Sequence, residues 1–192
     1  MLFVLCNADY RANQLTLCFS SDYVSLLMFP LKLVAFKYFE NTGTATAPYY
    51  SEKADDFNPF HTITDIGDRL KPAFFDANGD GLDDLFVGTQ LEGFKYYENT
   101  GSAASPVWTR RTGSEHPLNG FSPSEEGGLT LQFLDFNGDG LKDAIAGGYH
   151  TSSHAAPIHA LLNVGTSSGA VFSQVTGSSN VGSWWAYGMH RL

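Results

Sequence analysis

Short apolar runs, rich in aromatic and β-branched residues and bounded by glycine and polar residues, follow one another through most of the chain. Runs of this length and composition are typical of buried strands rather than helices. The predicted strands are 72–75, 85–89, 94–98, 107–110, 129–134, 144–148, 158–163 and 171–175. An aromatic content of 14% with 20 glycines suits short strands joined by tight turns. The chain is therefore predicted to be all-β.

The amino-acid sequence repeats along with the pattern of predicted strands. Residues 36–43, FKYFENTG, return at residues 94–101 as FKYYENTG, a shift of 94 − 36 = 58. A weaker copy of this strand and turn lies at 160–165. Each period holds four strand candidates, which is the content of one antiparallel β-propeller blade. We predict a β-propeller-like array of four-stranded antiparallel blades, incomplete, with about two full blades plus partial copies. Residues 51–68 and 113–128 would connect the blades.

Two acidic loops recur with nearly the same spacing. Residues 76–84 read DANGDGLDD and residues 135–143 read DFNGDGLKD, a shift of 135 − 76 = 59. Side-chain oxygens stand at every second place, glycine permits a sharp turn, and a last aspartate closes the set. Hard cations such as Ca²⁺ take six to eight oxygen ligands, so we predict two calcium ions per chain. The predicted ligands, with the leucines acting through their carbonyls, are Asp76, Asn78, Asp80, Leu82 and Asp84, and Asp135, Asn137, Asp139, Leu141 and Asp143.

The loops differ from those of an EF-hand. An EF-hand requires a bidentate Glu at its twelfth position and a helix on each side. Here the twelfth positions are Val87 and Ala146, and the flanking runs predict strands. Each loop is therefore expected to join two neighbouring strands. Repulsion among Asp76, Asp80 and Asp84 predicts a loop that is loose without metal and ordered with it.

The loops, the aromatic strands around them and the period of about sixty residues resemble the FG-GAP/VCBS repeats of integrin α-subunit-like propellers. The resemblance covers about residues 31–178. It implies Ca²⁺ in a hairpin between the first two strands of a blade, and extracellular or cell-surface adhesion and recognition. A propeller usually has four to eight blades. Two full copies and a partial one cannot close that ring, so a fragment, an open stack and an oligomerising part all stay open.

The ends of the chain depart from the repeat. Residues 1–30 form an atypical segment, either a degenerate first blade without a metal loop or an unrelated stretch. Residues 179–192 begin a further blade and stop before an acidic loop, and their aromatic residues are candidates for an exposed edge. Cys6 and Cys18 both fall in the first segment, and two cysteines fix no disulfide framework.

Charge and hydropathy exclude several classes of partner. The net charge of −9 would become −9 + 4 = −5 with two calcium ions, and no cluster of Lys or Arg is present. This argues against nucleic acid as a partner. No apolar run approaches the length of a membrane span. The opening apolar stretch is too short for a good signal peptide, although the resemblance implies an extracellular or cell-surface location.

The sequence contains no recognisable catalytic constellation. No Gly-x-Ser-x-Gly elbow or catalytic triad is apparent. His150, His154 and His159 lie close in sequence, but such spacing in a hairpin is usually incidental. We therefore predict a non-enzymatic protein that binds an unidentified protein or glycan, or associates with itself or with further blades through exposed blade edges. The alternative is an accessory propeller portion of a secreted carbohydrate-active enzyme.

Overall fold

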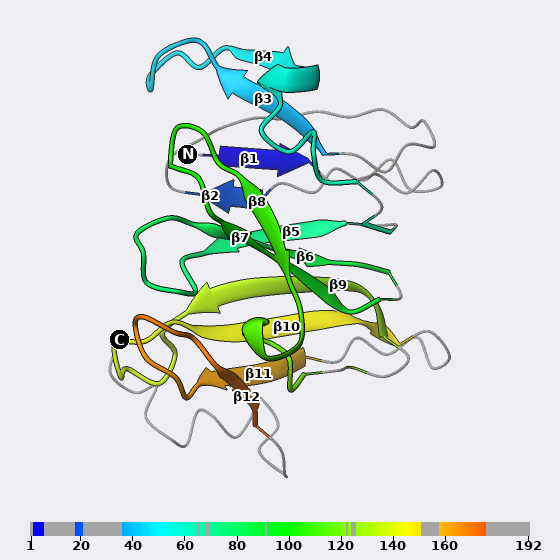
Figure 1. Cartoon of the computed structure of the whole chain (residues 1–192), viewed down its shortest axis with the longest axis vertical. Helices are drawn as coiled ribbons and strands as arrows, with labels where there is room; N and C mark the ends of the chain where they lie inside the picture. The colour runs from blue at the N-terminus through cyan, green and yellow to red at the C-terminus, as the bar shows by residue number, and fades with distance from the viewer. Residues whose placement is uncertain are drawn as a thin grey trace.

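Twelve strands form three four-stranded antiparallel sheets in the computed structural model, which describes residues 2–5, 18–20, 36–64, 66–67, 70–90, 92–121, 123, 126–150 and 158–175. Figure 1 shows the sheets stacked along the long axis of the molecule. The first sheet contains β1 (Leu2–Leu5), β2 (Cys18–Ser20), β3 (Lys37–Asn41) and β4 (Tyr50–Lys53). The middle sheet contains β5 (Lys71–Phe75), β6 (Asp84–Gly88), β7 (Phe94–Asn99) and β8 (Trp108–Arg111). The third sheet contains β9 (Glu126–Leu134), β10 (Asp143–His150), β11 (Ile158–Asn163) and β12 (Phe172–Gln174).

The middle and third sheets have the topology of simple meanders. Their strands lie in the orders β5-β6-β7-β8 and β9-β10-β11-β12, so each strand pairs with the next along the chain. The first sheet has the order β2-β1-β3-β4, in which β1 lies between β2 and β3. The predicted fold class is confirmed: the chain is nearly all-β, and in its described part the blade-like sheets do not close a ring.

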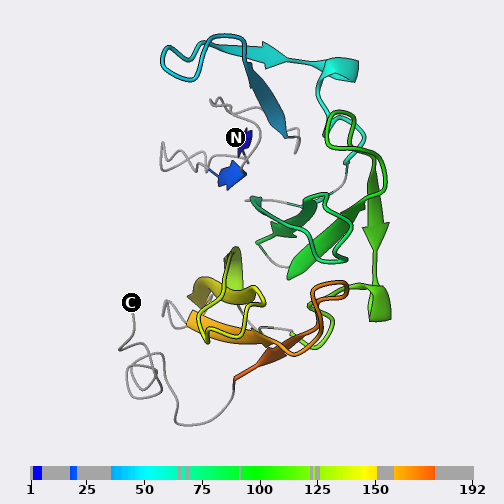
Figure 2. The same ribbon diagram turned by 90° about the vertical axis from the view of Figure 1, so that its left-hand side faces the viewer.

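One edge strand of each sheet lies beside an edge strand of the next sheet. β2 contacts β5, and β5 contacts β9. Figure 2 shows the three sheets edge-on, following one another. Inner strands that approach one another in this way are expected of blades arranged about a common axis. The strands β2, β5 and β9 thus form the inner edge of the array.

Two apolar cores hold the three sheets together, and β6 contributes to both. Because side chains alternate across a strand, Leu85 and Val87 pack in the core with the first sheet, whereas Phe86 packs in the core with the third. All five residues of β6 are buried. The first core is completed by Phe36, Tyr38, Phe60, Ile63, Ile66, Leu70 and Tyr97. The second contains Ala73, Tyr96, Leu118, Leu131, Ala144, Leu161 and Phe172 among its buried residues.

Each connection between sheets begins with a short 3-10 helix that the sequence did not predict. These are η1 (Asp55–Phe57) and η2 (Gly113–Glu115). The connections are also shorter than predicted, because β4 extends to Lys53 and β9 begins at Glu126. Strand pairing with the neighbouring strands accounts for both extensions.

Several sequence predictions fall outside the described residues. The further blade at 179–192, Cys6 of the cysteine pair and His154 of the histidine group all lie there. The separate character of residues 1–30 stays a prediction, although β1 and β2 pair within the first sheet. Within the part of the chain that the structure describes, no helix is long and apolar enough to cross a membrane.

Candidate metal centre

The two acidic loops occupy matching positions in their sheets. One joins β5 to β6 and the other joins β9 to β10, as the strand pattern predicted. Their glycines adopt the left-handed conformation, with φ of 75° at Gly79, 86° at Gly81, 80° at Gly138 and 87° at Gly140. A side chain at such a position is disfavoured. The Gly-Asp-Gly sequence is therefore what permits the loop to fold back on itself.

The first aspartate holds the first loop in shape. Asp76 Oδ1 accepts hydrogen bonds from the backbone N–H of Gly79 at 2.7 Å and of Asp80 at 3.2 Å, and its Oδ2 accepts one from Gly81 at 2.8 Å. Backbone N–H groups that converge on a carboxylate offset part of its charge. The loop therefore has its own means of limiting repulsion among its aspartates.

The third and fifth positions continue this pattern. Asn78 Oδ1 accepts from the N–H of Asp80 at 3.0 Å, and Asp80 Oδ1 accepts from the N–H of Leu82 at 2.8 Å. Asn78 Nδ2 also donates to Asp80 Oδ2 at 3.0 Å. The loop thus brings Asp76, Asn78 and Asp80 together on the protein surface.

The second loop has nearly the same hydrogen bonds. Asp135 accepts from the N–H groups of Gly138 at 2.7 Å and Gly140 at 2.9 Å. Asn137 Oδ1 accepts from the N–H of Asp139 at 2.9 Å, and Asp139 Oδ1 accepts from that of Leu141 at 2.8 Å. The two loops therefore adopt nearly the same conformation, although their residues differ at the positions outside the motif.

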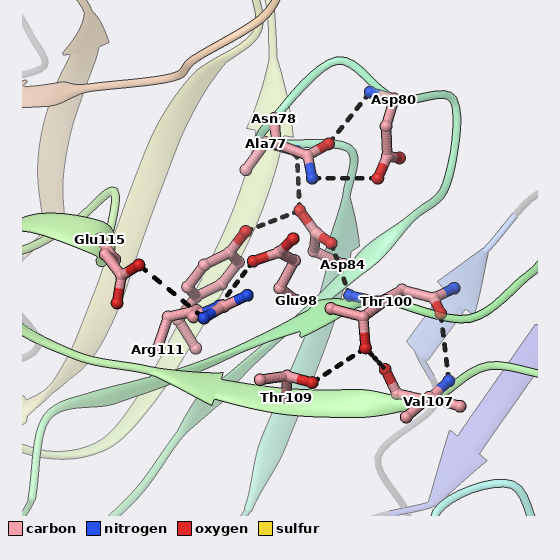
Figure 3. A network of polar contacts seen from close by, with 12 residues as sticks. Ala77, Asn78, Asp80, Asp84, Glu98, Thr100, Val107, Thr109, Arg111 and Glu115 are labelled. Atoms are coloured by element: carbon pink, nitrogen blue, oxygen red, sulfur yellow. Dashed lines mark hydrogen bonds and ion pairs between the residues drawn. The ribbon is translucent and has the colours of Figure 1, made fainter.

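The ninth-position aspartate of the first loop lies in the interior. Asp84 is 0% exposed, and Figure 3 shows its carboxylate between the loop and the strands β7 and β8. Its Oδ2 accepts from the N–H of Ala77 at 3.1 Å and from the Tyr96 hydroxyl at 2.8 Å. Its Oδ1 accepts from the N–H of Asn99 at 2.9 Å. Asp84 therefore links the metal loop to the end of β7.

Burial determines the electrostatics of this carboxylate. Loss of solvation raises the pKa of Asp84 from 3.8 to about 6, against the hydrogen bonds from Asn99, Tyr96 and Ala77, which lower it. The nearby charge of Asp80 adds to the increase. Burial and the adjacent Asp84 carboxylate also raise the pKa of the Tyr96 hydroxyl, which therefore stays protonated and acts as the donor.

Asp143 repeats this arrangement in the third sheet. It is fully buried, its Oδ2 accepts from the N–H of Phe136 at 3.2 Å, and its Oδ1 accepts from that of Asn163 at 2.9 Å. Burial raises the pKa of Asp143 as well. The tyrosine of the middle sheet has no counterpart here, because Ala160 stands at the position of Tyr96.

Asn99, to which Asp84 links the loop, begins a turn that recurs in the other two sheets. In the middle sheet, Asn99 Oδ1 accepts from the N–H groups of Gly101 at 3.1 Å and Val107 at 3.2 Å. Asn41 and Asn163 make the corresponding bonds in the other two sheets. In the sequence, the Asn-x-Gly motif marks the repeat. Its role in closing the turn between the third and fourth strands is visible only in the structure.

Whether a loop can hold a calcium ion depends on the lone pairs of its oxygens that are not already used in hydrogen bonds. A carboxylate offers about four lone-pair sites. Three donors already reach Asp84, so it has room for about one more bond. Among the described residues, no three side chains from His, Cys, Asp and Glu form a metal-binding group. The oxygens of positions one, three and five are of the kind that hard cations take, and the ninth aspartate lies behind them.

Comparison with protein families gives a match that contains both loops. The family model of the FG-GAP-like repeat matches residues 76–146. The chain carries an FG-GAP-like repeat. The match begins at the first aspartate of the first metal loop and ends inside β10, past the second metal loop. Neither the search of curated proteins nor the search of solved structures found a match.

FG-GAP-like repeats share three general properties. Such repeats form propeller-like domains, are generally non-catalytic and are typically found in extracellular proteins. Of the histidine group, His159 packs its ring 5.2 Å from that of Phe121, and its Nδ1 lies 2.8 Å from Gln174 Nε2. The calcium ligands stay a prediction.

Proposed function

We propose that this FG-GAP-like repeat protein is a non-enzymatic, calcium-stabilised binding module that acts outside the cell. The observation that supports calcium binding is the shared hydrogen-bond pattern of the two loops, which gathers the oxygens of Asp76, Asn78 and Asp80 at the surface. Calcium would bind to these groups, to the carbonyl of Leu82 and to one remaining lone pair of Asp84. Water would fill the other places, since calcium takes six to eight oxygens.

Calcium would act on stability rather than on chemistry. An ion bound to these oxygens would face the same carboxylates that the loop's N–H groups already hold, so it would reinforce a conformation that exists. Binding to the native state alone adds stability by mass action. Extracellular modules of this type bind calcium at about 10⁻⁴ to 10⁻³ M, so the sites would be occupied outside the cell. Surface recognition of a protein or glycan would be the activity of the module.

Calorimetric titration of the full chain with calcium tests the proposal, with thermal melts in calcium and in chelator. We expect two ions per chain and a higher melting temperature in calcium. Asp80→Ala and Asp139→Ala should each remove one ion and lower the melting temperature only in calcium. Asp83→Ala is the matched control, because Asp83 is the aspartate of the first loop that lies outside the predicted ligand set. Equal losses in calcium and chelator for the two ligand variants would refute the proposal.

A further inference from the structure

A groove lies where the first sheet meets the middle sheet. It encloses about 640 Å³ and is bordered by β3, β4, η1, the first metal loop and the turn between β7 and β8. Volumes of a few hundred Å³ are typical of ligand sites. Trp108 and Phe60 both line the groove: their rings stack at 5.4 Å, and Trp108 donates its Nε1–H to the carbonyl of Pro59 at 2.9 Å. The groove is thus a built feature of the junction.

Two exposed apolar side chains line this groove. Phe57 of η1 is 79% exposed and Val107 of the β7–β8 turn is 56% exposed. Phe57 follows Asp55, which has a φ of 49°. Aspartate is one of the few non-glycine residues that adopt this region readily, so it can begin the turn. The short helical turn that follows holds the Phe57 ring in solvent.

The second sheet junction provides an internal comparison. At the positions of Asp55 and Phe57, η2 has Gly113, with a φ of 61°, and Glu115, whose carboxylate lies 3.8 Å from the guanidinium of Arg111. The same turn is therefore made there by a glycine and a paired charge. An exposed phenylalanine is not needed for the turn itself. It is a property of the first junction.

The charge of the groove indicates the kind of occupant. The described lining residues include the carboxylates of Glu40, Asp56 and Asp83 against the single ammonium of Lys53. Lys53 pairs with Glu40 at 2.9 Å. The Asp56 side chain is 96% exposed, and its Oδ1 lies 3.6 Å from Nε2 of His61, which also lines the groove. A cation beside an aromatic face gains both from the carboxylates and from the ring. A neutral sugar could donate hydroxyl hydrogen bonds to these carboxylates but would gain no ionic attraction from the excess of negative charge, and one face of the Trp108 ring is already covered by Phe60.

We propose that this groove binds an extended peptide segment of a partner protein that carries a lysine or arginine beside an apolar side chain. Phe57 provides the aromatic contact, Asp56 attracts the cation, and Val107 meets the apolar side chain. The inference deepens the proposed binding role and rests on it, but it does not depend on the calcium ions.

Fluorescence anisotropy of the full chain with two labelled peptides tests this. The probe is acetyl-Ala-Leu-Arg-Leu-Ala-amide, and the comparison peptide has Glu in place of Arg. We expect the arginine peptide to bind, the glutamate peptide not to bind, and added salt to weaken binding. Phe57→Ala should weaken binding about tenfold or more, as for an aromatic hot spot. Asp56→Asn should weaken it up to about fivefold, as for an exposed ion pair.

Glu115→Ala is the matched control, because it changes the corresponding position of the other junction. It should leave peptide binding unchanged. Phe57→Ala and Glu115→Ala should both melt like the parent chain. Absence of arginine-peptide binding up to millimolar concentration, equal binding of both peptides, or equal effects of Phe57→Ala and Glu115→Ala would overturn the inference. So would binding of cellotetraose that Phe57→Ala abolishes while the peptide does not bind.

Calcium uptake measured on the same protein keeps the two proposals distinguishable. Peptide binding with no calcium uptake would refute the metal sites and support the groove. Calcium uptake without peptide binding would refute the groove and leave the metal sites supported.

Discussion

Asp84 joins three parts of one sheet through a single buried carboxylate. It accepts hydrogen bonds from the second residue of the metal loop, from a tyrosine in β7 and from the last residue of that strand. A buried donor or acceptor that loses its partner costs about 1 to 3 kcal/mol. The contribution of Asp84 to the fold is therefore independent of whether a metal is bound.

The raised pKa of Asp84 predicts a pH dependence of stability in chelator. The folded protein holds the proton up to about pH 6, whereas the unfolded chain releases it near 3.8, so the folded state binds more protons between these values. This contribution is fully present below pH 3.8 and is lost as the pH rises to about 6. We expect the free energy of unfolding to fall by about 2 kcal/mol from pH 4 to pH 7 through this group.

Urea unfolding of the parent chain and of Asp84→Asn, both in chelator, measures this effect. Asparagine does not titrate, so the difference in unfolding free energy between the two proteins should narrow as the pH rises from 4 to 7. A difference that stays constant across this range would show that Asp84 titrates alike in the folded and unfolded chains.

The two loops were predictable because their information is local. Alternating oxygens and a Gly-Asp-Gly turn can be read within nine residues, and the hydrogen bonds of Asp76 stay within that window. The burial of Asp84 was not predictable in the same way. Its partners Tyr96 and Asn99 lie 12 and 15 residues away, and neither residue type is by itself a sign of a buried carboxylate.

At the scale of elements, the two connections between sheets make equivalent hydrogen bonds with different residues. In the first, Asn58 Nδ2 donates to the carbonyl of Phe36 at 2.7 Å and its Oδ1 accepts from the N–H of Phe60 at 3.0 Å. In the second, His116 Nε2 lies 3.0 Å from the carbonyl of Phe94, and Nδ1 accepts from the N–H of Leu118 at 3.0 Å. These bonds require the neutral tautomer with hydrogen on Nε2, in agreement with a His116 pKa that burial lowers.

This equivalence predicts that His116→Asn is tolerated better than His116→Ala. Asparagine can restore both hydrogen bonds, whereas alanine leaves a carbonyl and an N–H without partners. We expect His116→Ala to cost about 2 to 4 kcal/mol and His116→Asn about 1 kcal/mol. Thermal or urea unfolding measures both, and Asn119→Ala, at an exposed position of the same connection, is the control. Equal losses for the two substitutions at position 116 would contradict the shared role.

Strand positions were read correctly where the apolar runs were long enough. The eight predicted strands of the middle and third sheets correspond to β5 through β12, with differences at their ends. The two 3-10 helices were missed because three residues of a polar connection carry no period. The order β2-β1-β3-β4 was missed for another reason: a strand inserted from earlier in the chain leaves no mark on the local pattern.

For the whole molecule, the first metal loop also takes part in the contact between sheets. Ala170, which follows the turn between β11 and β12, donates its N–H to the carbonyl of Ala77 at 2.8 Å. A Cβ on Gly79 would lie 2.3 Å from the carbonyl oxygen of Ser167 in that turn, whereas one on Gly138 would meet no described atom within 4 Å. The first loop therefore supports the third sheet, and metal bound there would act on both.

Replacing Gly79 and Gly138 by alanine distinguishes the cost of backbone strain from the cost of disturbing the contact between sheets. Both have a positive φ, so each substitution should cost about 1 to 2 kcal/mol of unfolding free energy. Gly79→Ala should cost about 1 to 3 kcal/mol more, because the added methyl group overlaps the neighbouring backbone. Urea unfolding of both variants in chelator gives the difference. Equal costs would mean that the turn of the third sheet does not rest on the loop.

Strand β6 is buried along its whole length and packs into both apolar cores. Its amide hydrogens can meet solvent only if packing fails on both faces, whereas those of an outer strand such as β4 or β12 need only the loss of one neighbour. Amide exchange by NMR or mass spectrometry should therefore be slowest at residues 85–88, with opening free energies close to that of global unfolding. The centre of the array would then be the last part to open, and the free energy of that opening would set how well its backbone resists proteolysis.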